Sequence, residues 1–421
     1  MYRVWNFVTN YSLLLIIGAV IALFWANTDP ESYHHFVDFE LIHDFIIGHA
    51  HYDANGIVEY RSLTLHYLVN DVLMAFFFAI AAKEVWEAVI LKNGSLRGKK
   101  AATPLFATAG GMIGPIAVYL GLAAFLGSDT YEAVKNGWAI PTATDIAFSY
   151  LVGRMVFGAG HPAVRFLLLL AIADDAAGLI ILAIFYPSGE LAPMWLLLSV
   201  FSAIGVYLLF NWLPRRMDKG NQLRPKSTWV REKLSFWPYL VAGCLSWFGF
   251  QESGLHPALG LLPIVPTLPH ADRAFGIFAE AEQYLTDLLN HCEHLLKHPV
   301  EIVLFFFGLL NAGVEFSAIA APTWLVLLGL IVGKPVGVLL FGWIAAGPMK
   351  LGLPQGMRTV DLFVIGCVAA IGFTVSLFIA SVAFEPGSVQ DAAKMGALLS
   401  FFAAILSIVA GKLARVQKQH G

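Results

Sequence analysis

Residues 170–178, Leu-Ala-Ile-Ala-Asp-Asp-Ala-Ala-Gly, place two adjacent acids, Asp174 and Asp175, inside a long apolar run. Counted from Ala163 at about 1.5 Å per helical residue, Asp174 lies roughly 16 Å along this run, near the middle of a bilayer core about 30 Å thick. Charged residues at that depth are costly and usually functional. An acid pair kept neutral by protonation and hydrogen bonds is the alternative, but two adjacent acids with no basic neighbour on their own helix favour a cation site.

The composition fits a membrane setting. Of the 421 residues, 58% are hydrophobic and 13% are charged, whereas soluble domains carry roughly 25% charged residues. We therefore expect an all-α polytopic membrane protein, a single transmembrane transporter domain over residues 1–421 within the lipid bilayer. The net charge of −3 offers no basic face for nucleic acid. The three cysteines show no metal-ligand spacing, and no cofactor is expected.

About twelve membrane-spanning helices can be drawn from the apolar runs. They are expected near residues 11–26, 66–91, 102–126, 137–157, 163–186, 191–213, 234–250, 254–268, 299–317, 323–346, 359–384 and 391–414. With a cytoplasmic N-terminus, and with Lys83 and Lys334 set apart as lying deep within spans, only Arg61, Lys135 and Lys394 among the basic residues fall on the far side, as the positive-inside rule requires. Both termini are predicted to be cytoplasmic.

An external stretch, residues 27–65, separates the first two spans. Within it, Asn55-Gly56 stands between β-prone residues, which is a hairpin signal. The stretch is either a solvated loop or a β-hairpin that pairs with its counterpart in a second subunit. The second interpretation predicts a homodimer.

Two spans are interrupted. In span 4, Pro141 removes a helix hydrogen bond, Thr144 can satisfy freed backbone groups, and Asp145 can cap the half-helix that follows. An ordinary proline kink with a capping acid is the alternative. In span 11, Gly372-Phe373-Thr374 forms a second interruption, which helix packing alone could also explain.

The positions of these interruptions suggest an internal repeat. Each interrupted span is the middle one of three, in 102–186 and in 323–414. The two trios begin at spans 3 and 10 and enter the membrane from opposite sides. Paired broken helices in inverted repeats are typical of transporters.

Lys334 lies near the midplane of span 10 and needs a carboxylate partner. Asp145, Asp174 and Asp175 are the candidates. We predict a pair with Asp174 in the ion-free, low-pH state, because adjacent acids diverge by about 100° around a helix. Asp175 is then the more persistent cation ligand.

Several anchors in this order resemble the bacterial NhaA-type sodium/proton antiporters, from about Asn70 to the end of the last span. The motifs that carry the resemblance are Asn70-Asp71-Val72-Leu73-Met74, Gly137-Trp138-Ala139-Ile140-Pro141, Ala143-Thr144-Asp145-Ile146-Ala147-Phe148, Asp174-Asp175, Asn311-Ala312-Gly313-Val314, Gly333-Lys334-Pro335 and Gly372-Phe373-Thr374.

The resemblance implies particular roles for these residues. Asp174 and Asp175 would bind Na⁺ and protons, supported by the broken-helix residues Asp145, Thr144, Lys334 and Thr374. A cytoplasmic pH-response region would contain Glu84, Glu293, His294 and His256. The chain lacks the family's usual basic residues after Glu84 and before Glu293, so its charge network differs. The implied location is the bacterial cytoplasmic (inner) membrane.

The sequence thus predicts an electrogenic antiporter that exchanges Na⁺ or Li⁺ for H⁺ by alternating access and is regulated by pH. Two alternatives stay open. An intramembrane aspartyl protease also buries two acids, but it needs them on separate helices, facing each other. A passive cation channel would be obstructed by a lysine at the midplane. No enzymatic activity is expected.

Overall fold

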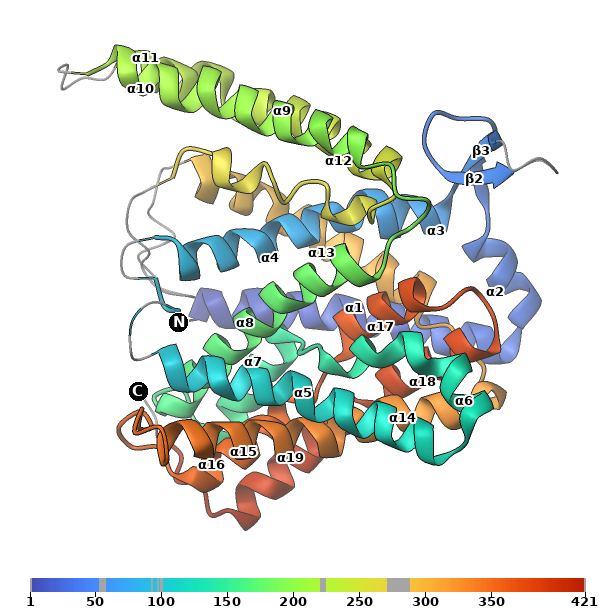
Figure 1. Cartoon of the computed structure of the whole chain (residues 1–421), viewed down its shortest axis with the longest axis vertical. Helices are drawn as coiled ribbons and strands as arrows, with labels where there is room; N and C mark the ends of the chain where they lie inside the picture. Colours follow the sequence, from blue (N-terminus) through green and yellow to red (C-terminus); the bar gives the residue numbers. More distant parts are fainter. Residues whose placement is uncertain are drawn as a thin grey trace. The chain divides into compact units, whose positions relative to one another are not determined.

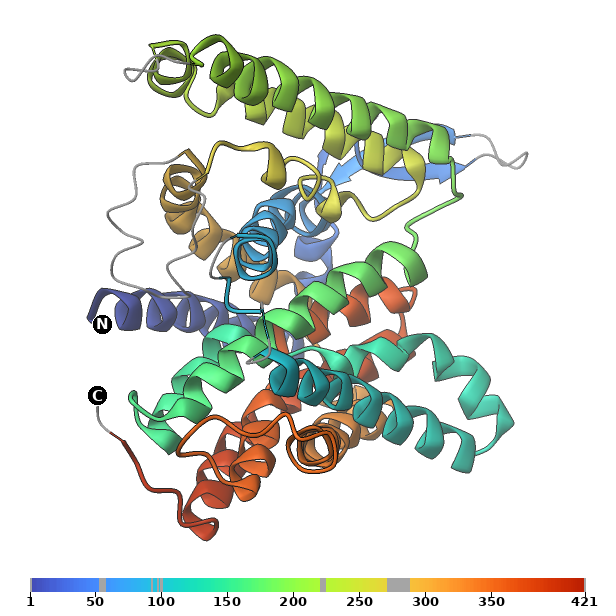
Figure 2. The same ribbon diagram turned by 60° about the vertical axis from the view of Figure 1, so that its left-hand side comes forward.

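The computed structural model describes residues 2–52, 58–91, 94–96, 98, 101–219, 225–270 and 288–419. Most of these residues are helical, as the composition predicts (Figures 1 and 2). The chain forms two compact units. Unit 1 consists of Met1–His34, Ser95–Ile181 and Leu304–Gly421, and unit 2 consists of His35–Gly94 and Leu182–Val303.

Unit 1 is helical in its described part, and several of its helices are interrupted or joined by tighter turns. Its elements are α1 (Tyr2–Thr28), most of α2 (Pro30–Val37), α5 (Ala102–Phe125), α6 (Ser128–Val134), the 3-10 helix η3 (Lys135–Thr142), α7 (Ile146–Phe157), most of α8 (Pro162–Phe185), the end of α13 (Leu288–Asn311), the 3-10 turn η10 (Phe316–Ala318), α14 (Ala321–Leu328), the π-helical turn η11 (Gly329–Gly333), α15 (Lys334–Ala346), α16 (Thr359–Ala369), α17 (Phe373–Ala383), α18 (Ser388–Leu399) and α19 (Phe402–Leu413).

Among the described residues, six helical runs are long and apolar enough to cross a membrane, or seven if the bent pair α16–α17 counts as one span. Three shorter apolar helices, Leu14–Thr28, Ile146–Phe157 and Pro299–Asn311, accompany them. The chain is therefore a multi-pass helical protein. The count of twelve spans stays a prediction.

Glycines bring α5 and α15 into backbone contact. A Cβ atom added at Gly110 would lie 2.2 Å from the carbonyl oxygen of Gly337, and one added at Gly337 would lie 2.0 Å from that of Gly110. One turn away, a Cβ at Gly114 would lie 2.3 Å from the carbonyl oxygen of Gly333. Such small residues let helices approach closely where no hydrophobic effect drives them together. This contact fixes the position of Lys334, the residue that follows Gly333.

Unit 2 contains helices and a small sheet. Its elements are β1 (Glu40–Ile42), β2 (His49–Tyr52), β3 (Val58–Thr64), α3 (Leu65–Tyr67), the π-helical turn η1 (Leu68–Leu73), α4 (Met74–Val89), the 3-10 turn η4 (Pro193–Trp195), α9 (Leu196–Val206), the π-helical turn η5 (Tyr207–Trp212), α10 (Leu213–Met217), α11 (Pro225–Trp229), the π-helical turn η6 (Val230–Leu234), α12 (Trp237–Ser253), the 3-10 turns η7 (Pro257–Leu259) and η8 (Val265–Thr267), and the first part of α13.

The sheet has the order β1-β3-β2 with antiparallel pairing, for example His51 opposite Tyr60. The predicted Asn55-Gly56 turn lies outside the described residues. Arg61 on β3 forms a two-pronged ion pair with Glu252 on α12, with its closest oxygen at 2.7 Å. This pair ties the sheet to the end of α12.

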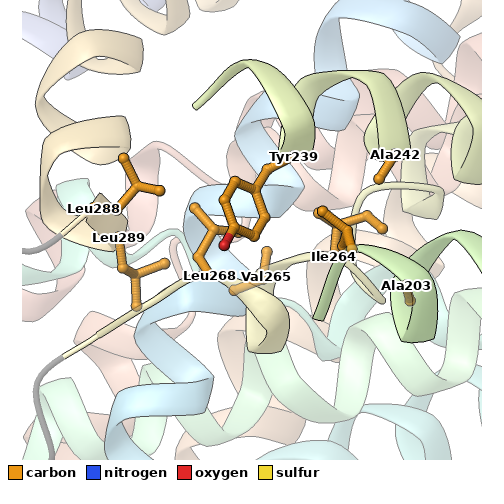
Figure 3. Packing of buried hydrophobic residues seen from close by; sticks show 9 residues of the cluster. Ala203, Tyr239, Ala242, Ile264, Val265, Leu268, Leu288 and Leu289 are labelled. Atoms are coloured by element: carbon orange, nitrogen blue, oxygen red, sulfur yellow. The ribbon is translucent and has the colours of Figure 1, made fainter. Parts of the chain in front are cut away.

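A cluster of buried apolar side chains joins α9, α12, the 3-10 turn η8 and the start of α13. Figure 3 shows the Tyr239 ring in the middle of this cluster, with residues such as Ile264 and Leu289 around it. α9 and α12 also run side by side (Figures 1 and 2), and the Ser199 and Ser246 hydroxyls lie 2.6 Å apart between them. The cluster forms the apolar centre of unit 2.

Two expected spans differ from the structure. Residues 254–268, expected as a helix, contain only η7 and η8, because Pro257, Pro263 and Pro266 each remove a helix hydrogen-bond donor. The expected span 299–317 is also wrong in its bounds. Helix α13 begins at Leu288 and ends at Asn311, before Gly313, where a Cβ would lie 2.0 Å from the ring of Tyr33.

Candidate functional site

Two helix interruptions meet inside unit 1. The 3-10 helix η3 ends at Thr142, and α7 begins three residues later at Ile146. Helix α16 ends at Ala369 and α17 begins at Phe373, with a bend of 55° between them. The backbone amide of Asp145 donates to the carbonyl of Ile371 across a distance of 2.8 Å. The two interruptions are therefore in direct contact.

Serines on each half-helix satisfy carbonyls of the other interruption. Ser149, the fourth residue of α7, donates to the Val368 carbonyl at 3.1 Å. Ser376, the fourth residue of α17, donates to the Ile140 carbonyl at 2.7 Å. Carbonyls at a helix end lack a partner within their own helix and need one elsewhere when they are buried. The reciprocal serine bonds thus stabilise both breaks at once.

Asp145 lies at the beginning of both half-helices. Its carboxylate accepts from the backbone amide of Phe148 at 3.2 Å, so it caps α7, as the sequence predicts. It also accepts from the hydroxyl of Thr374 on α17. Helix N-termini carry partial positive charge, and a carboxylate between two of them is stabilised. Asp145 therefore balances two helix N-termini from a position that is only 6% exposed.

Asp174 on α8 has two carboxylate oxygens in different surroundings. Oδ2 accepts from the Thr144 hydroxyl at 2.6 Å and faces the Lys334 ammonium at 3.0 Å. Oδ1 is buried and has no hydrogen-bond partner among the described residues. A buried carboxylate oxygen without a partner is costly. This oxygen is therefore suited to accept a proton or to bind a cation.

Lys334 is fully buried and links three groups. Its ammonium pairs with Asp174, as predicted from the sequence, and it also donates to the carbonyl of Thr142 at the end of η3. Helix C-termini carry partial negative charge, so the lysine compensates the end of η3 as well as the acid. Asp175, the half-buried neighbour of Asp174, also interacts electrostatically with Lys334.

The expected pH-response residues Glu84, Glu293, His294 and His256 all lie in unit 2. Glu293 pairs with Lys83 at 2.7 Å, and Lys83 also pairs with Glu87 at 3.0 Å. His256 instead faces Asp71, with 3.8 Å between its Nδ1 and the carboxylate. Glu84 lies on α4, next to Lys83 in the chain. The side chain of His294 lies outside the described part of the structure.

Sequence reasoning missed three elements of these sites. The sequence marks Lys83 and Asp71 as charges in an apolar span, but Glu293, which pairs with Lys83, and His256, which faces Asp71, are far away in the chain. The serines Ser149 and Ser376 could have been noticed as hydroxyls one turn after each break.

Within the described residues, no group of three or more His, Cys, Asp or Glu could hold a metal ion.

The architecture and the buried acid–lysine site define a polytopic helical membrane protein with a charged centre inside its apolar spans. The family model for Na⁺/H⁺ antiporter 1 matches residues 3–412. The chain therefore belongs to the Na⁺/H⁺ antiporter 1 family. This confirms the predictions of a Na⁺/H⁺ antiporter and of a multi-pass membrane protein.

Relatives agree over the full length. A Na⁺/H⁺ antiporter NhaA from Jannaschia sp. (strain CCS1) is 75% identical over 419 residues and covers 100% of both chains. One from Desulfitobacterium hafniense is 46% identical, covering 98% of this chain and 96% of the other. One from Geobacter sulfurreducens is 42% identical, covering 98% of each. A solved structure of the sodium proton antiporter MjNhaP1 from Methanocaldococcus jannaschii is 14% identical, with a TM-score of 0.44 over 97% of both chains.

Proposed function

We propose that the chain exchanges Na⁺, or Li⁺, for protons at a site formed by Asp174 and Asp175. The observation that carries this proposal is the asymmetric environment of Asp174. One carboxylate oxygen is engaged by Lys334 and Thr144, and the other is buried without a partner among the described residues. Such a carboxylate can change its partner without any helix having to unfold.

The exchange follows from competition for the same oxygens. When the site opens to one side, a dehydrated cation displaces the Lys334 ammonium from Asp174 and is also held by Asp175. When it opens to the other side, protons displace the cation. Asp174 is already ionised in its pair with Lys334, so the two protons released for one monovalent cation come from the Asp175 carboxyl and from the displaced Lys334 ammonium, and one net charge crosses the membrane in each cycle. The transport is therefore electrogenic, and alternating access couples the two gradients.

The contacts between the two interruptions support inverted repeats over residues 102–186 and 323–414. Ser149 and Ser376 occupy equivalent positions in α7 and α17, and each bonds to the opposite interruption. Gly110 and Gly337, on the first helices of the two trios, also contact each other reciprocally. Asp145, Thr374 and Lys334 then hold broken helices together next to the ion site rather than ligating the ion themselves.

The remaining parts of the proposal concern regulation and assembly. Glu84, Glu293, His256 and His294 form a pH response, supported by the pairing of Glu293 with Lys83 within apolar surroundings. The strands β2 and β3 pair with those of a second copy to give a homodimer. The protein lies in the cytoplasmic membrane with both termini in the cytoplasm, as the distribution of Lys and Arg requires.

The rival functions have less support. An aspartyl protease needs two carboxylates that face each other, whereas the nearest charged partner of Asp174 is Lys334. A passive channel needs an open path for cations, and a buried lysine beside the site repels them. The family relationship favours neither rival.

Purified protein in proteoliposomes tests the proposal directly. Na⁺ added outside should make the lumen more alkaline as protons leave, and Na⁺ loaded inside should make it more acidic. A membrane potential should change the rate of exchange, because each cycle moves net charge. Lower pH should weaken the apparent Na⁺ affinity, because protons compete for Asp174 and Asp175. An exchange rate that does not change with the membrane potential would refute the electrogenic stoichiometry. Na⁺ flux without proton flux would refute antiport.

A further inference from the structure

A cavity of about 490 Å³ lies within unit 2, among α4, α12, η7, η8 and the start of α13. This volume is within the range of about 300–1,000 Å³ that is typical of ligand sites. Its walls are almost entirely apolar, with Phe76, Trp247 and Leu261 among the lining side chains. The cavity is separate from Asp174 and Lys334, and antiport as described above makes no use of it.

The polar groups of the cavity gather at one end. Lys83 is the last residue of α4 to line it, and Glu293 on α13 pairs with Lys83 there. Cys292 lines the wall beside Glu293 and interacts electrostatically with Tyr239. The Tyr239 hydroxyl is buried and has no hydrogen-bond partner among the described residues. An occupant with an apolar body and one polar end would fit this arrangement.

The length of the cavity matches one membrane leaflet. Along the end of η1 and α4 it extends from Val72 to Lys83, eleven residues and about 16 Å at 1.5 Å per residue. Half of a bilayer core is about 15 Å. The mouth opens on the apolar surface of α12, because Cys244 both lines the cavity and is exposed, between the exposed side chains of Val241 and Leu245.

We propose that this cavity binds one acyl chain of a zwitterionic membrane phospholipid. The chain enters from the bilayer beside Cys244 and lies along α4. Lys83, Glu87 and Glu293 together carry one net negative charge when ionised. A zwitterionic headgroup can present its cation to them, whereas an anionic headgroup is repelled.

The native cysteines provide the test, since Cys292 is half-buried in the cavity wall and Cys367 is buried outside it. The full chain is purified in a steroid-based detergent without alkyl chains and titrated with phosphatidylethanolamine. N-ethylmaleimide modification of each cysteine is followed by peptide mass spectrometry. At about ten times the dissociation constant, mass action leaves roughly one cavity in eleven open, so Cys292 should react about tenfold more slowly. Cys367 should not change.

Two further measurements make the result specific. Phosphatidylglycerol should need a higher concentration to protect Cys292. Ala79→Phe, which places a ring at the cavity wall, should abolish lipid protection and remove one phospholipid retained in native mass spectrometry. Val200→Phe, at an exposed position of α9 that does not line the cavity, is the matched control and should behave like the unaltered protein.

An unchanged Cys292 rate with phosphatidylethanolamine would overturn the proposal, and so would equal retention of lipid by Ala79→Phe. Equal protection by phosphatidylglycerol would overturn the zwitterionic preference. If Ala79→Phe does not fold, the lipid titration of the unaltered protein still decides.

Discussion

Lys83 in unit 2 and Lys334 in unit 1 are both buried lysines with acid partners, and the two arrangements differ. In unit 2, the Lys83 ammonium lies between two carboxylates, those of Glu87 and Glu293, at 3.0 and 2.7 Å. In unit 1, Lys334 pairs with Asp174 through one oxygen only, and the second oxygen of that acid is left over. Lys83 therefore has two carboxylates for one positive charge. Lys334 contacts a single carboxylate, and one oxygen of that carboxylate has no hydrogen-bond partner among the described residues.

This difference separates a structural charge from an exchangeable one. Removing a partner from a buried ion pair is strongly destabilising, because the other charge is left uncompensated. Lys83 would remain paired after losing either acid. Lys334 contacts one carboxylate, that of Asp174, while Asp175 acts on it only electrostatically, and the second oxygen of Asp174 is left to a proton or a transported cation. A buried pair with a leftover acceptor therefore indicates exchange, and a doubly paired lysine indicates a fixed connection between helices.

The largest expected effect is on transport. Asp174→Asn should abolish Na⁺-driven proton exchange in proteoliposomes, because the amide can neither titrate nor carry the charge that attracts a cation. Asp175→Asn should do the same. Glu132→Gln, an exposed acid paired with Lys135, is the control and should keep normal exchange. Normal exchange by Asp174→Asn would remove the distinction between the two lysine sites.

The second effect is on stability in unit 1. Lys334→Ala leaves Asp174 buried without its counter-charge, which should cost about 3–5 kcal/mol of unfolding free energy. The melting temperature in detergent should fall clearly, and Na⁺ should restore part of it by occupying Asp174. Lys412→Ala, at an exposed position of α19, should leave the melting curve unchanged. A Lys334→Ala protein as stable as the original would show that Asp174 is neutral in the resting state.

A smaller effect should follow in unit 2. Lys83→Met brings Glu87 and Glu293 together without their shared cation, at a cost of about 1–3 kcal/mol, since both acids are partly exposed and can take up protons or water. The Na⁺ concentration for half-maximal exchange at alkaline pH should stay within about twofold, well below the tenfold that 1.4 kcal/mol would give. A large loss of Na⁺ affinity would contradict a structural role for Lys83.

The smallest expected effect concerns the two serines. Ser149→Ala and Ser376→Ala each remove one buried hydrogen bond to a helix-end carbonyl, worth about 1 kcal/mol. If the two interruptions are equivalent, the two losses in melting temperature should be similar. Ser407→Ala, whose hydroxyl bonds only within its own helix, is the control and should cost less. A loss confined to one serine would argue against equivalent interruptions.

Much of the site could be predicted because buried charge demands compensation. A lysine and two acids at similar depth in apolar spans have few ways to be neutralised, so the Asp174–Lys334 pair followed from positions along the helices. Asp145 as a helix cap followed from the proline and threonines before it. In these cases the residue type and its depth in the span are enough to show that a buried charge or helix end must be compensated.

Other features depended on contacts that local sequence does not encode. Residues 254–268 were predicted to be a span because they are apolar. Their prolines prevent a regular helix, and the prediction did not take them into account. The start of α13 at Leu288 was missed because polar residues there were interpreted as a loop, although they continue the helix. The pairing of His256 with Asp71 joins residues far apart in the chain, which a single sequence does not reveal.

The glycine contact between α5 and α15 has a consequence for the speed of transport. Gly110 and Gly337 bring the two backbones so close that a Cβ atom at either position would collide with the other helix. We expect a step that displaces the helix carrying Lys334 to displace the closely packed α5 with it, as one body. Collective helix movements of this kind take microseconds to milliseconds, far longer than a side-chain rotation. Two residues without side chains thus set a lower limit on the duration of each cycle in which α15 moves.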